Sequence, residues 1–274
     1  MKRLKVIMAM GKKGLIELVR YRDWIIGLII WPAVFPLVYI LNARVLSGKD
    51  GSLAGNFVKI TGYSDFKGYI LIGSLVYMWV NMTLWSFGSF LRSEQKKGTL
   101  ESLWICPINK FDIIIGGSVV TVIRSFIYVF ISILEYKILY GLQLKGNLLQ
   151  WIVIFVVILI GVIGIGSILA SLVLWVKEAN VAVHIVRGIV MVFAGISFPI
   201  IVMPNFMQII SKSLSFTFGI EAARAVMLNG SSLIETIEPL MLCLVLGVIY
   251  FIIGRLIFVI LERKVREEGS LSRF

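Results

Sequence analysis

The stretch 148–176, LLQWIVIFVVILIGVIGIGSILASLVLWV, decides the fold class. It contains no Asp, Glu, Lys or Arg. A helix crosses the hydrocarbon core of a bilayer with about 20 apolar residues, and this run is longer than that. A helix on the surface of a soluble protein keeps a polar face and has no reason to be apolar all round over such a length. The stretch therefore predicts a helix embedded in a membrane.

The rest of the chain has the same character. Of its 274 residues, 59% are hydrophobic and 15% are charged, against about 45–50% and 25% in soluble domains. The predicted fold is all-α, in one transmembrane domain over residues 1–274. Six apolar runs qualify as transmembrane helices, and they lie at 24–41, 68–91, 113–134, 148–176, 179–203 and 240–261.

The positions of Lys and Arg predict the orientation. With the N-terminus inside, sixteen of these residues fall in inner segments and eight in outer segments. Basic residues concentrate in the cytoplasmic connections of membrane proteins. We therefore expect a multi-pass protein of the cell membrane with both termini in the cytoplasm.

Composition also excludes several classes of function. The net charge of +12 is divided among the connections between apolar runs, so it forms no stripe for a nucleic acid. One His and two Cys residues provide no metal-ligand spacing. The phosphate loop G-x-x-x-x-G-K-[ST] is absent from the sequence, so we expect no ATPase motif, no catalytic residues and no cofactor bound by this chain.

Two segments outside the apolar runs have helical patterns. Apolar residues repeat at helical spacing within 1–23, with Lys and Arg mostly on other faces, which predicts an amphipathic helix on the inner membrane surface. The outer segment 204–237 is too apolar for a solvated loop. We expect two short helices that dip back into the outer leaflet, with a break near 215–219.

The most informative connection is the cytoplasmic segment 92–112. Gly98 is expected to end one helix, and Thr99 is placed to cap a new one with Glu101 in its first turn. Leu100, Leu103 and Trp104 then share one helical face, and Pro107 stops the helix. This pattern predicts a short amphipathic helix. It either holds a tight loop at the inner leaflet or docks a cytoplasmic partner.

The run Glu94…Gly98-Thr99-Leu100-Glu101…Trp104…Pro107, ending in Gly116, resembles the signature of ABC-2 type exporter permeases. A second match, Gly195-Ile196-Ser197-Phe198-Pro199, then Met203-Pro204, then Glu221-Ala222-Ala223-Arg224, is similar to the fifth span and outer re-entrant helices of that family. Phe216-Thr217-Phe218 stands where many members have Asn-Pro, which leaves the register of the outer helices open. By this resemblance, the residues that correspond to the outer re-entrant helices of the family are Pro199, Pro204, Glu221 and Arg224.

The resemblance implies an ATP-driven exporter whose motor is a separate ABC ATPase. Two ATPase copies, with ATP and Mg on them, would dock beneath two permease copies, as a homodimer. The segment that couples to the ATPase would comprise Arg92, Glu94, Gly98, Thr99, Leu100, Glu101, Leu103, Trp104 and Pro107. The Leu100, Leu103 and Trp104 face would fill a groove of the ATPase, and Glu94 and Glu101 would pair with its basic rim. The small outer loops and the apolar walls would suit an amphipathic drug, a lipid, a lipid-linked glycan or a peptide, and sodium export stays open. We expect a drug or lipid-like cargo.

Each charged residue within the predicted spans has a possible functional role and a possible structural role. Arg124 either contacts an anionic head group in the translocation path or has a structural role, in a buried ion pair or as a cap of backbone carbonyl groups. Asn180, His184 and Arg187 share one helical face, which either lines an inner vestibule or holds Arg187 for pairing with Glu178 or Asp112. The small residues of 161–171 are expected to pack within one subunit or, alternatively, to form a dimer seam.

Other functions predict other features. A secondary transporter or channel subunit without an ATPase would show inverted repeats and acidic residues deep in its spans. A membrane enzyme would need paired carboxylates or a His, Ser and Cys constellation. An assembly or immunity factor stays open, but none of these three gives a reason for the 99–106 helix.

Overall fold

A computed structural model of the chain describes residues 2–22, 24–47, 52–176 and 179–267. In these ranges every regular element is a helix. Along the chain they are α1 (Lys2–Arg20), α2 (Trp24–Ser47), α3 (Ser52–Thr61), α4 (Phe66–Lys96), α5 (Leu100–Ile105), α6 (Lys110–Tyr140), α7 (Leu148–Val176), α8 (Ala179–Phe193), the 3-10 turn η1 (Ile200–Val202), α9 (Asn205–Ser213), α10 (Ser215–Arg224), the π-helical turn η2 (Ala225–Asn229) and α11 (Ile237–Glu267).

Among the described residues, five helices are long and apolar enough to cross a membrane: α2, α4, α6, α7 and α11. The predicted span at 179–203 is wrong in its second half, because α8 ends at Phe193. There the chain turns through Gly195, whose φ of +67° is left-handed, and Pro199 precedes the turn η1. With 15 residues, α8 is about 22 Å long, shorter than the roughly 30 Å hydrocarbon core. A sixth crossing stays a prediction.

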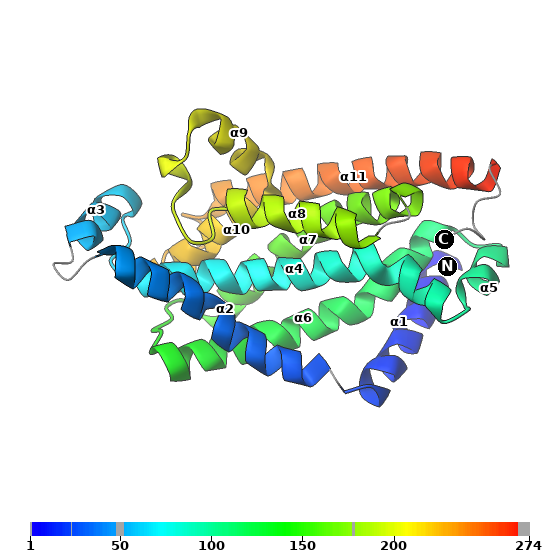
Figure 1. The fold of residues 1–274 in the computed structure, drawn as a ribbon, viewed down its shortest axis with the longest axis horizontal. Coiled ribbons are helices and arrows are strands. Elements are labelled where there is room, and N and C mark those ends of the chain that lie inside the picture. The colour runs from blue at the N-terminus through cyan, green and yellow to red at the C-terminus, as the bar shows by residue number, and fades with distance from the viewer. Residues whose placement is uncertain (1, 23, 48–51, 177–178, 268–274) are drawn as a thin grey trace.

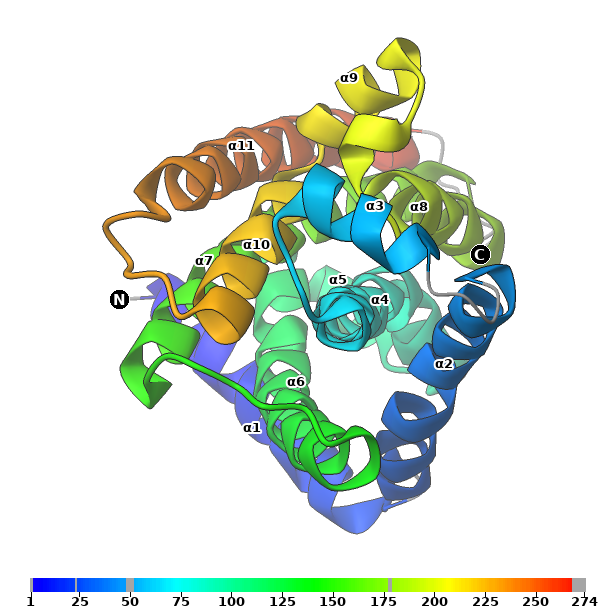
Figure 2. The same ribbon diagram turned by 90° about the vertical axis from the view of Figure 1, so that its left-hand side faces the viewer.

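Helix α4 forms the centre of the bundle. Figure 2 shows it surrounded by α2, α6, α7, α8 and α10. Its N-terminal half, from Gly68 to Val80, is buried without interruption. A helix buried on all sides needs no polar face, and its small residues allow the neighbours to approach closely. The core of the molecule is therefore built around α4.

Small residues join α7 to α11. A Cβ added at Gly247 of α11 would lie 2.7 Å from the Cα of Gly161, and one at Gly254 would lie 2.1 Å from Ser167 Oγ. The Ser171 hydroxyl donates to the Gly254 carbonyl oxygen at 2.9 Å. Packing of the small-residue face of α7 within one chain is thereby confirmed.

The outer faces of the bundle are apolar. Few residues of the most apolar windows of α2 and α11 are buried, and both helices expose Ile and Leu side chains such as Ile26 and Ile260. Such surfaces are stable against lipid or against another apolar protein face, not against water. This exposure agrees with a protein that lies in a membrane.

The two ends of the bundle differ (Figure 1). The start of α1, the helix α5 and the end of α11 lie at one end, whereas α3 and α9 lie toward the other. The predicted amphipathic helix in 1–23 is present as α1. Its Met10 is buried against α6, while Leu4, Met8, Ile16 and Val19 are exposed apolar residues.

The two predicted outer helices are present as α9 and α10. The break lies at Leu214, between Ser213 and Ser215, and therefore just before the predicted position. Pro204 directly precedes α9, where its missing N–H costs no hydrogen bond. The depth of these helices in a membrane stays a prediction.

Candidate functional site

The connection between α4 and α6 holds the short helix α5 through an unusual backbone at Gly98. Its φ is +68°, a left-handed conformation that side chains with a Cβ adopt at a cost. The Gly98 amide donates to the Gln95 carbonyl oxygen at 2.9 Å, and the next residue, Thr99, is the N-cap of α5. Gly98 thus ends α4 as predicted and turns the chain into α5.

The predicted capping role of Thr99 is wrong. Thr99 stands at the N-cap position, but its hydroxyl makes no hydrogen bond to the first turn of α5. The hydroxyl instead donates back to Glu94, to the carbonyl oxygen at 3.1 Å and to the carboxylate at 2.7 Å. Thr99 therefore ties α5 to the end of α4.

The apolar face of α5 is turned inward. Leu100 is 8% exposed and belongs to a core cluster with Leu91 and Phe111, and Trp104 packs against this cluster, half-buried. Leu103 is also half-buried. We predicted that this face fills a groove of a partner, but Leu100 and Trp104 pack against the protein's own core. The face anchors α5 on α4 and α6.

A different face of α5 is open. Ile105 is 84% exposed, the highest exposure among the large hydrophobic residues described. Glu101, Ser102, Cys106 and Pro107 around it are exposed as well. We call Glu101, Ser102, Ile105 and Cys106 the open face of α5. These side chains are the part of α5 that is open to a contact from outside the chain.

Glu94 is an internal residue, which corrects its predicted place on the rim of a docking surface. It is 3% exposed and forms an ion pair with Lys13 of α1. Lys97 lies 3.9 Å from the same carboxylate and 2.7 Å from that of Glu17. Arg3 and Asp112 make a further pair at 3.7 Å between α1 and α6. Charged groups thus link α1 to both helices that hold α5. Arg92 is exposed and donates to the side-chain oxygen of its neighbour Gln95 at 2.9 Å.

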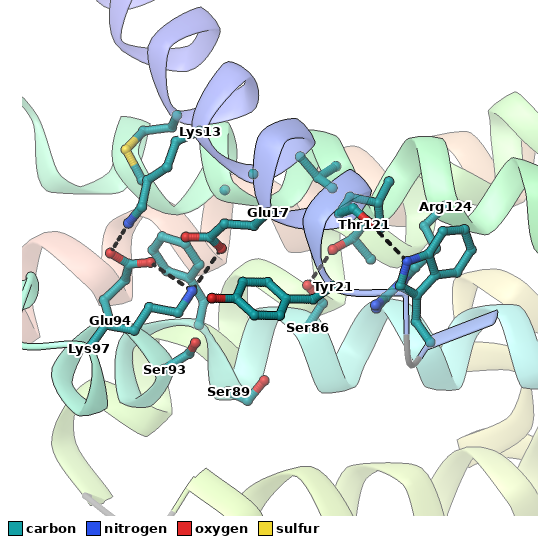
Figure 3. A pocket seen from close by; sticks show the side chains of 17 residues that line it. Lys13, Glu17, Tyr21, Ser86, Ser89, Ser93, Glu94, Lys97, Thr121 and Arg124 are labelled. Carbon is teal, nitrogen blue, oxygen red and sulfur yellow. Dashed lines mark hydrogen bonds and ion pairs between the residues drawn. The ribbon is translucent and has the colours of Figure 1, made fainter. Parts of the chain in front are cut away.

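Above this network lies a cavity of about 450 Å³ between α1, α4 and α6, which we call the inner cavity. Figure 3 shows Lys13, Glu94 and Lys97 toward one end of it and Arg124 at the other. Its walls include the hydroxyls of Ser86 and Thr121, which share a hydrogen bond. The inner cavity is polar along much of its length.

A second cavity of about 340 Å³ continues beyond Arg124, and we call it the arginine cavity. Arg124 of α6 and Arg187 of α8 both line it, so the structure brings together two of the predicted path residues. Arg187 lies over the ring of Trp85, 5.7 Å from its centroid. The lining residues are Trp31, Phe35, Tyr77, Met78, Asn81, Met82, Trp85, Arg124 and Arg187.

His184, a third predicted path residue, does not line the arginine cavity but contacts one of its walls. His184 is exposed and stands edge-on to Trp85, with ring centroids 5.6 Å apart. The side chain of Asn180 and the residue Glu178 lie outside the described residues. Asp112, an expected partner of Arg187, lies beside Arg3 instead.

Sequence reasoning missed the α4 wall of the arginine cavity. Tyr77, Asn81 and Trp85 follow one another at intervals of four, so they share a helical face. Asn81, a polar residue within an apolar run, was the signal in the sequence that could have indicated this wall. The two aromatic residues that α2 contributes, Trp31 and Phe35, follow no pattern that indicates a cavity.

At the end of α10, Arg224 is a buried structural residue. It donates to the carbonyl oxygens of Tyr69, Gly195 and Ile196, at 3.1, 2.8 and 2.6 Å. Glu221 is exposed and lines a cavity of about 290 Å³ together with Pro199, which precedes η1. Arg224 thus fixes the turn that ends α8.

These features define a multi-pass helical membrane protein with two cavities beside its central helix. The sequence profile of the ABC-2 family transporter protein matches residues 53–256, which is most of the chain. The chain belongs to this family of transporter permeases. No curated protein matches the sequence. Members of the family are transmembrane components, so a partner ABC ATPase is implied in general.

Proposed function

We propose that the chain is the permease subunit of an ATP-driven exporter, which carries an amphipathic drug, lipid or lipid-linked molecule out of the cytoplasm. ATP and Mg bind a separate ABC ATPase subunit. The observation that carries the proposal is α5. It is pinned from behind by Leu100 and Trp104, it exposes Ile105, and it lies in the part of the chain matched by the transporter family.

The place of α5 in the bundle supports a role as a lever. It lies at the same end as the start of α1 and the end of α11, the segments richest in basic residues (Figure 1). Positive charge favours the cytoplasmic side, where an ATPase would be found. In the proposed complex two ATPase copies each contact the open face of one of two permease copies in the cell membrane.

The contacts between α5 and the rest of the chain would transmit a movement of the ATPase to the membrane helices. A push on α5 acts on Leu91 of α4 and Phe111 of α6 through Leu100 and Trp104. The same push acts on α1 through Thr99, Glu94 and Lys13. Because packed cores are bistable rather than continuously deformable, such a push shifts whole helices. Helix α6 carries Arg124, which lines both cavities, so its displacement changes the proposed path.

The test is co-purification of the permease with each ABC ATPase of the same genome, followed by ATP-dependent transport in vesicles. Ile105→Asp is expected to reduce ATPase capture at least about tenfold, since a central apolar contact replaced by a charge costs 2 kcal/mol or more. Ile234→Asp is the matched control, because Ile234 is 81% exposed but lies in the outer connection before α11. Its capture should be unchanged.

Two results would overturn the proposal. One is equal ATPase capture and transport in the two variants. The other is transport by the permease alone, driven by an ion gradient without ATP, which would establish a secondary transporter or channel subunit.

A further inference from the structure

We infer that the cargo is an anionic amphiphile, whose head group binds Arg187 and Arg124 and whose apolar tail lies against the aromatic wall of the arginine cavity. This inference rests on the proposed export function and names its substrate class. It is carried by the pairing of two guanidinium groups with aromatic side chains in one cavity.

The charge of the cavity has one sign. Of the described residues that line it, two are arginines, one is an asparagine and the rest are aromatic residues or methionines, with no carboxylate among them. A guanidinium keeps its charge at every physiological pH, so the cavity is positive whenever it is empty. Charged residues within membrane helices face a cavity or a partner and mark the path of a charged substrate.

The surroundings of Arg187 suit it to hold an anion. Its guanidinium lies over the Trp85 ring, which covers one face of the group by a cation–π contact. Its Nε is buried and has no hydrogen-bond partner among the described residues. A buried N–H that lacks an acceptor costs free energy, and a carboxylate or phosphate oxygen satisfies it. The N–H groups of a guanidinium form a planar fork that matches such oxygens.

Arg124 extends the positive region toward the cytoplasmic end. It lines the arginine cavity on one side and the inner cavity on the other (Figure 3). At the far end of the inner cavity, the carboxylates of Glu17 and Glu94 are held by Lys97 and Lys13. An anion that enters from the inner side therefore meets these paired charges first and then Arg124.

The walls argue against a small inorganic anion. Phe35 and Tyr77 stack with ring centroids 5.2 Å apart, and both line the cavity. Trp31, which also lines it, is 59% exposed on the open side of α2, where an apolar tail can continue into lipid. A volume of about 340 Å³ lies at the lower end of the range for drug-sized ligands, about 300–1,000 Å³. It fits a head group with the first part of a tail.

The test compares three amphiphiles that share one chain and differ in charge. The purified permease with its ATPase is placed in phosphatidylcholine nanodiscs, and ATP hydrolysis is measured with hexadecyl phosphate, hexadecylphosphocholine and hexadecyltrimethylammonium. Hexadecyl phosphate should stimulate hydrolysis at a concentration at least tenfold lower than the other two. Inorganic phosphate should not compete with it. Equal stimulation by all three amphiphiles, or full competition by inorganic phosphate, would overturn the inference.

Variants assign the effect to Arg187. Arg187→Gln should remove the preference for hexadecyl phosphate, and Arg187→Lys should keep part of it. Arg255→Gln is the control, because Arg255 is an exposed arginine of α11 that does not line the cavity. A preference that survives Arg187→Gln would overturn the inference.

A binding measurement separates this inference from the proposed function. Quenching of tryptophan fluorescence by hexadecyl phosphate is recorded with the permease alone. Binding that depends on Arg187, in a permease that captures no ATPase, would support the inference and refute the exporter. ATP-driven transport without a preference for the charge of the amphiphile would support the exporter and refute the inference about its cargo.

Discussion

The guanidinium carbon of Arg224 lies 3.4 Å from the centre of the Tyr69 ring, and both side chains are buried. Arg224 also donates hydrogen bonds to three backbone carbonyl oxygens, one on α4 and two in the turn after α8. Burial lowers the pKa of Arg224 to about 10, with Tyr69 opposing the shift. The group therefore stays charged at neutral pH and holds three elements together.

Removal of this side chain should destabilise the protein strongly. Arg224→Ala removes three hydrogen bonds from a charged group to backbone carbonyl oxygens, and each such bond contributes up to about 1.5–3 kcal/mol. We expect the variant to lose about 3 kcal/mol of stability, measured as a lowered melting temperature in detergent. Arg263→Ala removes an exposed arginine of α11 and should melt like the parent protein. Equal melting of both variants would contradict the structural role of Arg224.

The pair Lys13–Glu94 should couple α1 to α4. Glu94 is nearly buried, whereas Lys13 is one-third exposed, so loss of either charge leaves the other poorly compensated. Glu94→Gln is expected to reduce stability by about 1–3 kcal/mol and to speed hydrogen exchange in α1. Glu101→Gln, at an exposed position of α5, is the control and should leave exchange in α1 unchanged.

A double-mutant cycle gives the strength of this pair. Lys13→Met and Glu94→Gln together should cost less than the sum of the single changes, because both remove the same interaction. Strict additivity would show that the two side chains do not interact.

The contact of α7 with α11 should tolerate no added methyl group. A Cβ at Gly247 would lie 2.7 Å from the Gly161 backbone, so Gly247→Ala must push two helices apart. The expected cost is about 1–3 kcal/mol, measured by thermal melting. A Cβ at Gly188 of α8 would meet nothing within 4 Å, so Gly188→Ala should be neutral or stabilise by up to about 1 kcal/mol. A stable Gly247→Ala variant would refute the close packing.

The long apolar helices could be predicted from sequence because their pattern is local. The run 148–176 contains no charge, and α7 has these same bounds. The end of α8 was missed because hydrophobicity continues through Ile196 and Phe198, while Gly195 turns the chain. Composition records where apolar residues are, but a single backbone conformation decides where a helix stops.

In the candidate site too, local patterns could be predicted from the sequence, whereas contacts between distant segments could not. Helical spacing correctly placed Leu100 and Trp104 on one face of a short helix, but spacing cannot show what covers that face. The cover is the protein's own core, and the exposed residue is Ile105. Arg124 and Arg187 were each visible as charges in apolar runs. Their meeting across one cavity depends on the packing of α6 and α8 around α4, which no local pattern records.

The turn at Gly98 allows the proposed lever to be tested through the backbone alone. Its φ is +68°, and a Cβ there would meet nothing within 4 Å, so a substitution strains the backbone without a clash. Gly98→Ala should cost about 1 kcal/mol and Gly98→Asn less, because Asn adopts this conformation more readily. Gly98→Val should cost most. If α5 couples the permease to an ATPase, transport per ATP hydrolysed should fall in the same order.

Gly62 supplies the matched control for this series. It has a φ of +73° and equally open surroundings, but it follows α3, toward the opposite end of the bundle. Gly62→Ala should therefore lower the melting temperature about as much as Gly98→Ala and leave transport per ATP unchanged. If both alanine variants uncouple transport equally, the loss reflects stability, and α5 is no lever. If only Gly98→Ala uncouples it, the conformation of this turn sets how the motion of an ATPase reaches α4 and α6.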